Sequence, residues 1–475
     1  MRDQTGLATS LLLLLFAVTG MAEEPLVIDE SKYQLPGADA TIPAWAGTRK
    51  DEPFQVKEFL ESRTAPAGNA APLYLYAMSR FANDFAYLVP EEDRPALQVR
   101  SKAILGEAAK LTDRDSLKEI ATSPEVEAYL QQVRPYLKLV DQAQQRPQCV
   151  FISGLQIDSL LPHAQTSRSI ARMCQLEIAN ACARSDFKTA EAAEFRIFRM
   201  SRDIRPRGML ISQLVSCALD AVMVHAILND HLSQPSLTFA DCDRLLAILQ
   251  EHQQDPIDMY VEGLKMEFVM EGNIVDGFQK KMLAPKMLDL NSIVVSRFNF
   301  DVEWKAISEI TALSLAIPLS EDVRGVSARL IDQKVENMRK NFDKEIKSPL
   351  NSIPLLLGTT KLDVPVLASI LLPATSQFGE ACRRHRARLQ GVILFTAVRR
   401  YQLKHGRLPE TLLVAAREAG IQEIPIDPYD GQPMRYVVID GKPVVYSVAV
   451  DRVDDGGQAD WEFGKQPGDF LFKLP

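Results

Sequence analysis

Four aspartates lie close together near the C-terminal end of the sequence. They are Asp451, Asp454, Asp455 and Asp460. The same segment contains Gly456 and Gly457, which let a loop expose its backbone carbonyl groups. Calcium takes about six to eight oxygen ligands from such a loop, although the residue order of an EF-hand is absent here. Asp451, Asp454 and Asp455 are therefore candidate calcium ligands, and a solvated turn without a metal is the alternative.

A second group of acidic residues lies in the apolar segment YVEGLKMEFVMEG at 260–272. Glu267 and Glu271 are four residues apart, so a helix places them on one face. If that face lined a cleft, burial would raise the pKa of a carboxyl there and suit it to acid catalysis. No nucleophile or metal ligand is evident beside them. The sequence therefore favours a solvated helix edge and leaves Glu267 and Glu271 as weak catalytic candidates.

The remaining sequence offers little local catalytic chemistry. The six histidines form no HExxH motif, and there is no GxSxG, SxxK or glycine-rich phosphate loop. A net charge of −8 argues against a nucleic-acid partner, and 46% hydrophobic with 24% charged residues is typical of a folded, soluble protein. The six cysteines include no CxxC pair. Buried free thiols are favoured over disulfides, which an oxidising compartment would permit.

The first 22 residues have the layout of a signal peptide. Arg2 precedes an apolar stretch at 11–22, which is shorter than the about 20 residues that cross a bilayer and is followed by Glu23. We therefore predict cleavage of residues 1–22 and export to the periplasm or the extracellular space, with an uncleaved anchor as the alternative. No later window is expected to be long and apolar enough for a membrane span, so the mature chain should be soluble.

Helical periodicity dominates the residues that would position these groups. Residues 23–66 are rich in proline, glycine and charge, which indicates an irregular entry segment on the surface. In 67–373, apolar side chains recur every three or four residues, as in Leu210, Leu214 and Cys217. Short turns such as 184–186 separate these stripes, which predicts an array of helical hairpins. A basic run at 383–388 is predicted to be a solvated, partly paired helix face.

The last part of the chain, 374–475, changes from helical to strand periodicity. An apolar helix at 391–398 continues to His405 and Gly406, the usual stop signal of a helix. Segments 435–439 and 443–450 flank an Asp-Gly-Lys turn, which predicts a β-hairpin, and 469–472 supplies a last short strand. The expected fold class is therefore mainly α, a helical hairpin array, with a small C-terminal α+β module.

Four segments of this tail occur in the order of a known domain. RRYQLKHGRLPETL, IPIDPYDGQPMRY, VVYSVAVDRVDDGG and GDFLF resemble the globular part of type II secretion major pseudopilins, over about the last 90 residues. In that family the loop after the Tyr-Ser pair binds Ca²⁺, so the resemblance implies that Asp451, with Asp454 or Asp455, holds calcium. Ala449 and Arg452 stand where the family usually has glycine, and their side chains disfavour a positive φ. The long region before the tail implies a reused module, not a pilin.

The whole arrangement also resembles a group of uncharacterised exported bacterial helical proteins, a likeness that implies no activity. We expect a non-catalytic helical binding or scaffold protein of the cell envelope, with a C-terminal cap that Ca²⁺ would stabilise. Its partner would be an envelope protein or polymer, not a nucleic acid. The alternative is an envelope hydrolase that uses carboxylates in an interhelical cleft. Converging titratable groups with a perturbed carboxyl would favour the enzyme, and a groove with dispersed polar groups would favour binding.

Overall fold

The structure is a computed structural model, which describes most of the chain beyond the predicted signal peptide. The described residues are 28–33, 35, 42–63, 68–112, 117–151, 161–284, 298–316, 333–334, 336–338, 340–341, 365–371, 374–458 and 468–475. The predicted signal peptide at 1–22 and Asp460 lie outside these residues.

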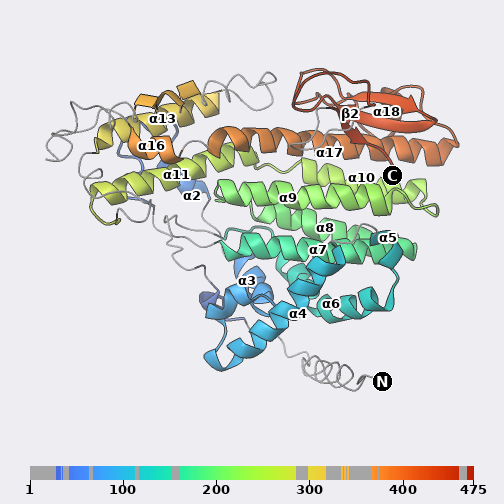
Figure 1. Ribbon diagram of the computed structural model, residues 1–475, viewed down its shortest axis with the longest axis horizontal. Coiled ribbons are helices and arrows are strands. Elements are labelled where there is room, and N and C mark those ends of the chain that lie inside the picture. Colours follow the sequence, from blue (N-terminus) through green and yellow to red (C-terminus); the bar gives the residue numbers. More distant parts are fainter. Residues whose placement is uncertain are drawn as a thin grey trace.

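Helices make up most of the described structure (Figure 1). The longer ones are α2 (Val56–Ser62), α3 (Ala71–Ser79), α4 (Arg94–Thr112), α6 (Pro124–Gln144), α7 (Pro162–Ala183), α8 (Phe187–Asp203), α9 (Leu210–Ala226), α10 (Phe239–Gln253), α11 (Met259–Gln279), α13 (Phe300–Ala316), α16 (Val366–Leu371), α17 (Ala374–His405) and α18 (Leu412–Glu418). Short helical turns are η1 (Glu30–Lys32), η2 (Asn83–Leu88), η3 (Glu91–Asp93), α5 (Leu117–Ile120) and the π-helical η4 (Ile227–His231). The strands are β1 (Arg435–Ile439), β2 (Lys442–Ser447) and β3 (Phe470–Phe472).

The helices are stacked in layers. Figure 1 shows α9 and α10 between the α7 and α8 layer and the long helix α17, and α10 packs directly against both α8 and α17. Short capped turns connect the layers. Ser185 adopts a positive φ of 58° between α7 and α8, and the Asp186 side chain accepts a hydrogen bond from the Thr189 N–H at the start of α8. The predicted helical hairpin array is confirmed.

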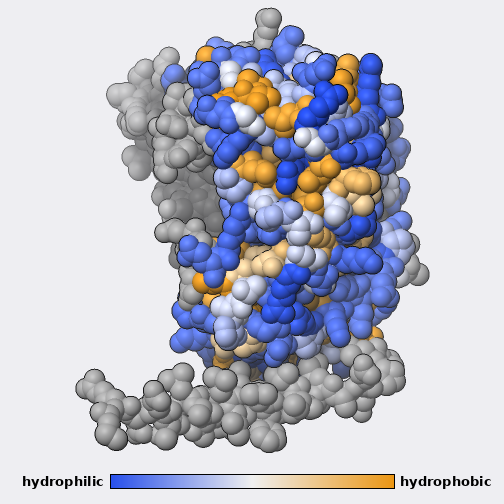
Figure 2. Space-filling view, turned by 90° about the vertical axis from the view of Figure 1, so that its right-hand side faces the viewer, coloured by the Kyte–Doolittle hydropathy of each residue, from blue (hydrophilic) through white to orange (hydrophobic). Residues whose placement is uncertain are grey.

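One hydrophobic core extends through these layers. It reaches from Trp45 in the entry segment, through the helices, to Phe472 in the tail. On the face shown in Figure 2, polar side chains predominate and apolar side chains appear in separate patches. The expectation that the entry segment lies on the surface fails for Trp45, Val56 and Leu60, which are buried. Their apolar side chains fill space beside the helices, a role that the surrounding proline, glycine and charge did not reveal.

One stretch of the core is long and apolar enough to cross a membrane. It covers Leu210–His231, which comprises α9 and η4, and 67% of its most apolar 18-residue window is buried inside the protein. The prediction that no later window reaches this length is therefore wrong. A core helix flanked by other helices on several sides has the same composition as a membrane span, because both are surrounded by apolar groups.

The tail contains a small antiparallel sheet in the order β1-β2-β3. Ile439 pairs with Lys442 at the end of the β1–β2 hairpin, and Asp440 and Gly441 between them have φ values of 49° and 75°. Two positive φ angles are what a tight hairpin turn needs, which explains the Asp-Gly signal in the sequence. The expected fold class, mainly α with a small C-terminal α+β module, is thus confirmed.

Helix α17 belongs to both the helical layers and the tail. Its partners include α9 and α10 on one side and α18, β2 and β3 on the other. This enclosure corrects the prediction of a solvated basic face, since Arg383 is only 3% exposed and Arg388 lies over the ring of Phe470. Burial lowers the pKa of Arg388 below its usual value. The charge pattern showed arginines but not the two layers that cover them.

Gly391 lies where α17 packs against the sheet. A Cβ atom at this position would overlap the ring of Phe472, which is buried. We expect Gly391→Ala to destabilise the protein by about 1–3 kcal/mol through this overlap, although alanine is the better helix former. The control is Gly106→Ala in α4, where nothing lies within 4 Å and a gain of about 0.5–1 kcal/mol is expected. Urea unfolding of both variants checks this, and a stabilised Gly391→Ala would contradict the close packing.

Candidate functional site

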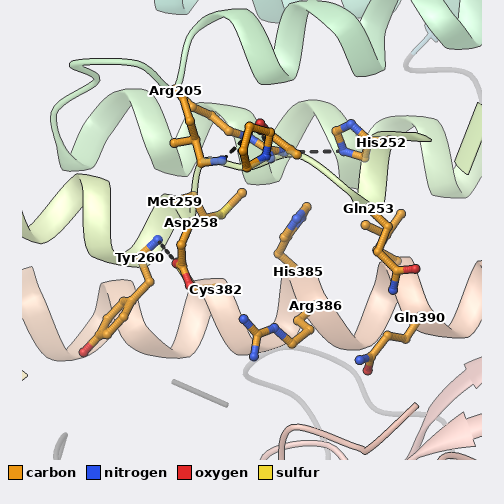
Figure 3. A pocket seen from close by; sticks show the side chains of 14 residues that line it. Arg205, His252, Gln253, Asp258, Met259, Tyr260, Cys382, His385, Arg386 and Gln390 are labelled. Carbon is orange, nitrogen blue, oxygen red and sulfur yellow. Dashed lines mark hydrogen bonds and ion pairs between the residues drawn. The ribbon is translucent and has the colours of Figure 1, made fainter. Parts of the chain in front are cut away.

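A pocket of about 330 Å³ lies where the loop between α10 and α11 faces α17. Figure 3 shows His385 and Arg386 on α17, with His385 directed towards Arg205 and His252 across the pocket. The full lining is Arg205, His252, Gln253, Asp255, Pro256, Ile257, Asp258, Met259, Tyr260, Cys382, His385, Arg386, Leu389 and Gln390. The pocket is therefore assembled from segments that are far apart in the sequence.

A buried carboxylate, Asp220, lies behind the wall of this pocket. Its Oδ2 atom is 3.0 Å from His252 Nε2, 3.4 Å from His385 Nδ1 and 3.1 Å from Arg205 Nη2. Asp220 is 2% exposed, so these contacts replace water around the charge. We call Arg205, Asp220, His252 and His385 the Asp220 cluster. It brings together one anion, one permanent cation and two imidazoles.

Arg205 is held rigidly in the turn between α8 and α9. Its Nη1 atom is 2.7 Å from Asp255 Oδ2, and its Nε donates a hydrogen bond to Ser216 Oγ at 2.9 Å. The guanidinium thus joins Asp255 on the pocket rim to Asp220 behind it. Because the planar guanidinium has donors in fixed directions, these bonds fix the position of the carboxylate and with it the two histidines.

Burial favours a neutral His385. It lowers the pKa of His385 to about 3; Asp220 opposes this effect, and electrostatic interactions with Arg205, His252 and Arg388 add to it. Burial alone would raise the pKa of Asp220, but its interactions with His252, His385 and Arg205 hold that pKa below its usual value. At neutral pH the site therefore contains an ionised Asp220 and an uncharged His385 that can accept a proton.

The pocket also has polar groups suited to ligand binding. The Asp258 carboxylate already has hydrogen-bond partners. Its Oδ1 atom accepts the backbone N–H groups of Tyr260 and Val261 at the start of α11. Arg386, in contrast, forms no ion pair with any described residue, and the Gln390 Oε1 atom is buried without a hydrogen-bond partner in the described structure. A small polar molecule could satisfy both groups.

The weak catalytic candidates Glu267 and Glu271 do not line this pocket. The preferred prediction of a solvated helix edge is nevertheless wrong, since Glu271 is 1% exposed and its Oε1 atom has no hydrogen-bond partner in the described part of the chain. Burial raises the pKa of Glu267 to about 7, and burial together with the nearby Glu267 raises the pKa of Glu271 well above its usual value. Helix α11 packs against α9, α13 and α17, which is why its acidic face is covered.

The candidate calcium ligands lie in the loop after β2, where the carboxylates of Asp451 and Asp454 have other partners. Asp451 accepts the N–H groups of Val453 and Gly468, and Asp454 Oδ2 is 2.9 Å from Arg435 Nε. Among the described residues, which include Asp455, no three or more His, Cys, Asp or Glu side chains form a group that could hold a metal ion. The Arg435 guanidinium thus supplies a positive charge beside Asp454. The calcium site stays a prediction of the resemblance.

The loop itself shows one clear departure from the sequence argument. Ala449 and Arg452 have φ values of 52° and 61°, the region that glycine favours. The side chains at these two positions therefore do not prevent a positive φ. The Ala449 N–H donates to Ser447 Oγ, and the Asp451 carboxylate accepts the backbone N–H groups of Val453 and Gly468. These bonds hold the strained backbone, which costs about 1 kcal/mol or more for each such residue.

Sequence reasoning missed the Asp220 cluster altogether. Asp220 and His252 lie on α9 and α10, while His385 belongs to the basic run of α17. No short motif joins them. The available signal was Asp220 itself, a charged residue between apolar neighbours in the best-defined apolar stripe, because such a residue needs a buried partner.

Comparison with known proteins adds no further information about this site. The chain matches no protein-family model, and no curated protein or solved structure is significantly similar to it.

Proposed function

We propose that this protein is an acid–base enzyme, in which His385 transfers a proton to or from a small polar molecule in the pocket. The observation that supports this most directly is the buried Asp220 carboxylate behind the pocket wall, 3.4 Å from His385 Nδ1. A carboxylate in this position orients an imidazole and stabilises the imidazolium that forms when it takes a proton. The simplest reaction of this kind is hydrolysis, with His385 accepting a proton from the attacking water.

The second support is the charge of the pocket. Arg386 and the amide groups of Gln253 and Gln390 face it, so a substrate with an anionic or strongly polar group would find donors there. An anion bound near Arg205 and Arg386 would offset the positive charges that lower the pKa of His385. Substrate binding would thereby make His385 a stronger base when it is needed.

This proposal adopts the hydrolase alternative of the sequence analysis but assigns it to different residues. The criterion stated there, converging titratable groups with a perturbed carboxyl, is met by Asp220, His252 and His385, not by Glu267 and Glu271. A pocket that binds a ligand without turnover would instead support the binding or scaffold role. Location in the cell envelope, the partner and the pseudopilin-like origin of the tail stay predictions.

We expect His385→Gln to lower kcat about 10²- to 10⁴-fold on any substrate identified by screening hydrolase substrates, with little change in folding. Because burial keeps the pKa of His385 at about 3 in the free protein, kcat/KM should persist below pH 6 instead of falling near 6.5. The control is His225→Gln, since His225 is exposed on the same helix as Asp220. Equal kcat in the wild type and His385→Gln would exclude His385 as the acid–base group.

A further inference from the structure

Three sulfur-containing side chains from three helices pack in one buried cluster beside the pocket. The Cys217 Sγ atom on α9 is 3.4 Å from the Met259 Sδ atom at the start of α11. The Cys382 side chain on α17 packs in the same buried cluster, and the neighbouring Cys217 thiol adds to the burial that raises the pKa of Cys382. We call Cys217, Met259 and Cys382 the sulfur cluster. Its members come from distant parts of the sequence, so only the fold brings them together.

The surroundings of the sulfur cluster are apolar and nearly dry. Cys217, Met259 and Cys382 are 9%, 7% and 2% exposed, and they form a separate apolar cluster with Leu264 and Phe378. Met259 and Cys382 also line the pocket. A small ion could thus enter through the pocket and reach the sulfurs without unfolding a helix. All six cysteines of the chain are free and buried, as the sequence favoured, so both thiols are available as ligands.

The donor set has a definite chemical preference. Thiolate and thioether sulfurs are soft ligands, which select Cu(I) and related monovalent soft ions over Ca²⁺ or Mg²⁺. Methionine sulfur binds such ions without losing a proton, whereas each cysteine releases one proton when it becomes a ligand. Two thiolates and one Cu(I) leave a net charge of −1. Arg386 lines the same pocket and provides the compensating positive charge.

We infer that the sulfur cluster is a binding site for one Cu(I) ion, with Cys217 and Cys382 as thiolate ligands and Met259 as a thioether ligand. No electron transfer is involved, because the ion binds as Cu(I) and the two released protons go to solvent through the pocket. The inference is independent of the proposed acid–base function. It rests on the sulfur contacts, not on the Asp220 cluster, and either can fail without the other.

The test is an anaerobic titration of the full protein with Cu(I) in competition with bicinchoninate. We expect one Cu(I) per chain and a copper–thiolate absorption band in the near ultraviolet. Met259→Leu preserves volume and should weaken binding about tenfold, and Cys382→Ser should weaken it at least a hundredfold. The control is Cys242→Ser, since Cys242 is also a buried free thiol and lies on α10. This control should bind as tightly as the wild type.

Three results would overturn the inference. The first is a wild-type protein that takes no Cu(I) from bicinchoninate. The second is an equal loss of affinity in Cys242→Ser and Cys382→Ser. The third is a Cys217–Cys382 disulfide, seen by peptide mass spectrometry as a cross-linked pair that persists in the purified protein. Circular dichroism of each variant, with Met259→Leu as the mildest change, separates loss of binding from loss of fold.

Discussion

Asp220→Ala should lower the free energy of unfolding by about 3–5 kcal/mol, the usual cost of leaving a buried charge without its partner. Asp220 binds Arg205 and is within 3.4 Å of two histidines, and all four groups are buried or nearly so. Without the carboxylate, the guanidinium of Arg205 keeps only Asp255 as an acidic partner and must remain in an apolar environment. Urea denaturation at pH 7 measures the effect.

The matched control for Asp220→Ala is Asp243→Ala. Asp243 also pairs with an arginine across two helices, Arg400 on α17, but it is 47% exposed. An exposed pair contributes about 0–1 kcal/mol, so this variant should unfold nearly as the wild type does. If Asp220→Ala cost as little as Asp243→Ala, the cluster would not hold the layers together as its geometry implies.

Glu267→Gln should stabilise the protein by about 3 kcal/mol at pH 8 and have almost no effect at pH 4. Burial raises the pKa of Glu267 from about 4.5 in the unfolded chain to about 7 in the folded protein. The folded state therefore binds the proton more strongly, and its stability is greatest below pH 4.5 and falls as pH rises to 7. A pKa difference of about 2.5 corresponds to about 3 kcal/mol of unfolding free energy at about 1.36 kcal/mol per pKa unit. The wild type loses this stability at high pH, whereas the glutamine variant keeps it.

The measurement for Glu267→Gln is the urea midpoint of wild type and variant from pH 4 to pH 8. The control is Glu58→Gln on α2, where the side chain is exposed and the two curves should run parallel. Glu303 also makes the protein less stable as pH rises, since burial raises its pKa to about 7 as well. A constant difference between wild type and Glu267→Gln across this range would show that folding does not raise the pKa of Glu267.

Buried histidines also make the stability of the protein depend on pH, but in the opposite direction. Burial lowers the pKa of His163, stacked on Phe151, to about 3, the same value as for His385. The unfolded chain then binds these protons more strongly, so stability falls as pH drops from about 6.5 to about 3. The buried glutamates therefore favour low pH and the buried histidines favour higher pH, so the two effects oppose each other between about pH 4.5 and 6.5.

Local signals in the sequence predicted the elements well. The apolar stripe of α9, the capping box of Thr238 and Asp241 at α10, and the Asp-Gly turn between β1 and β2 each depend on neighbours within a few residues. What could not be predicted was which faces become covered. The basic run of α17 and the acidic face of α11 have the pattern of solvated helix faces, yet each lies under a layer supplied by distant residues.

The candidate site was less accessible to prediction for the same reason. Asp220, His252 and His385 become neighbours only when α9, α10 and α17 stack, and a motif search compares residues at short, fixed spacing. The tail loop was also hard to predict in detail. Ala449 and Arg452 have positive φ values although their side chains disfavour them, and Asp454 faces Arg435, which is 19 positions away in the sequence.

The long reach of α17 has a consequence for how the chain acquires its structure. The ion pair of Arg400 with Asp243 joins residues 157 positions apart, so synthesis must pass well beyond α10 before α17 can dock. Until then the sides of α9 and α10 that face α17 lack its cover. Contacts of such large sequence separation slow folding. A holding chaperone that shields these helices in the nascent protein would therefore raise the yield more than one that acts on the tail.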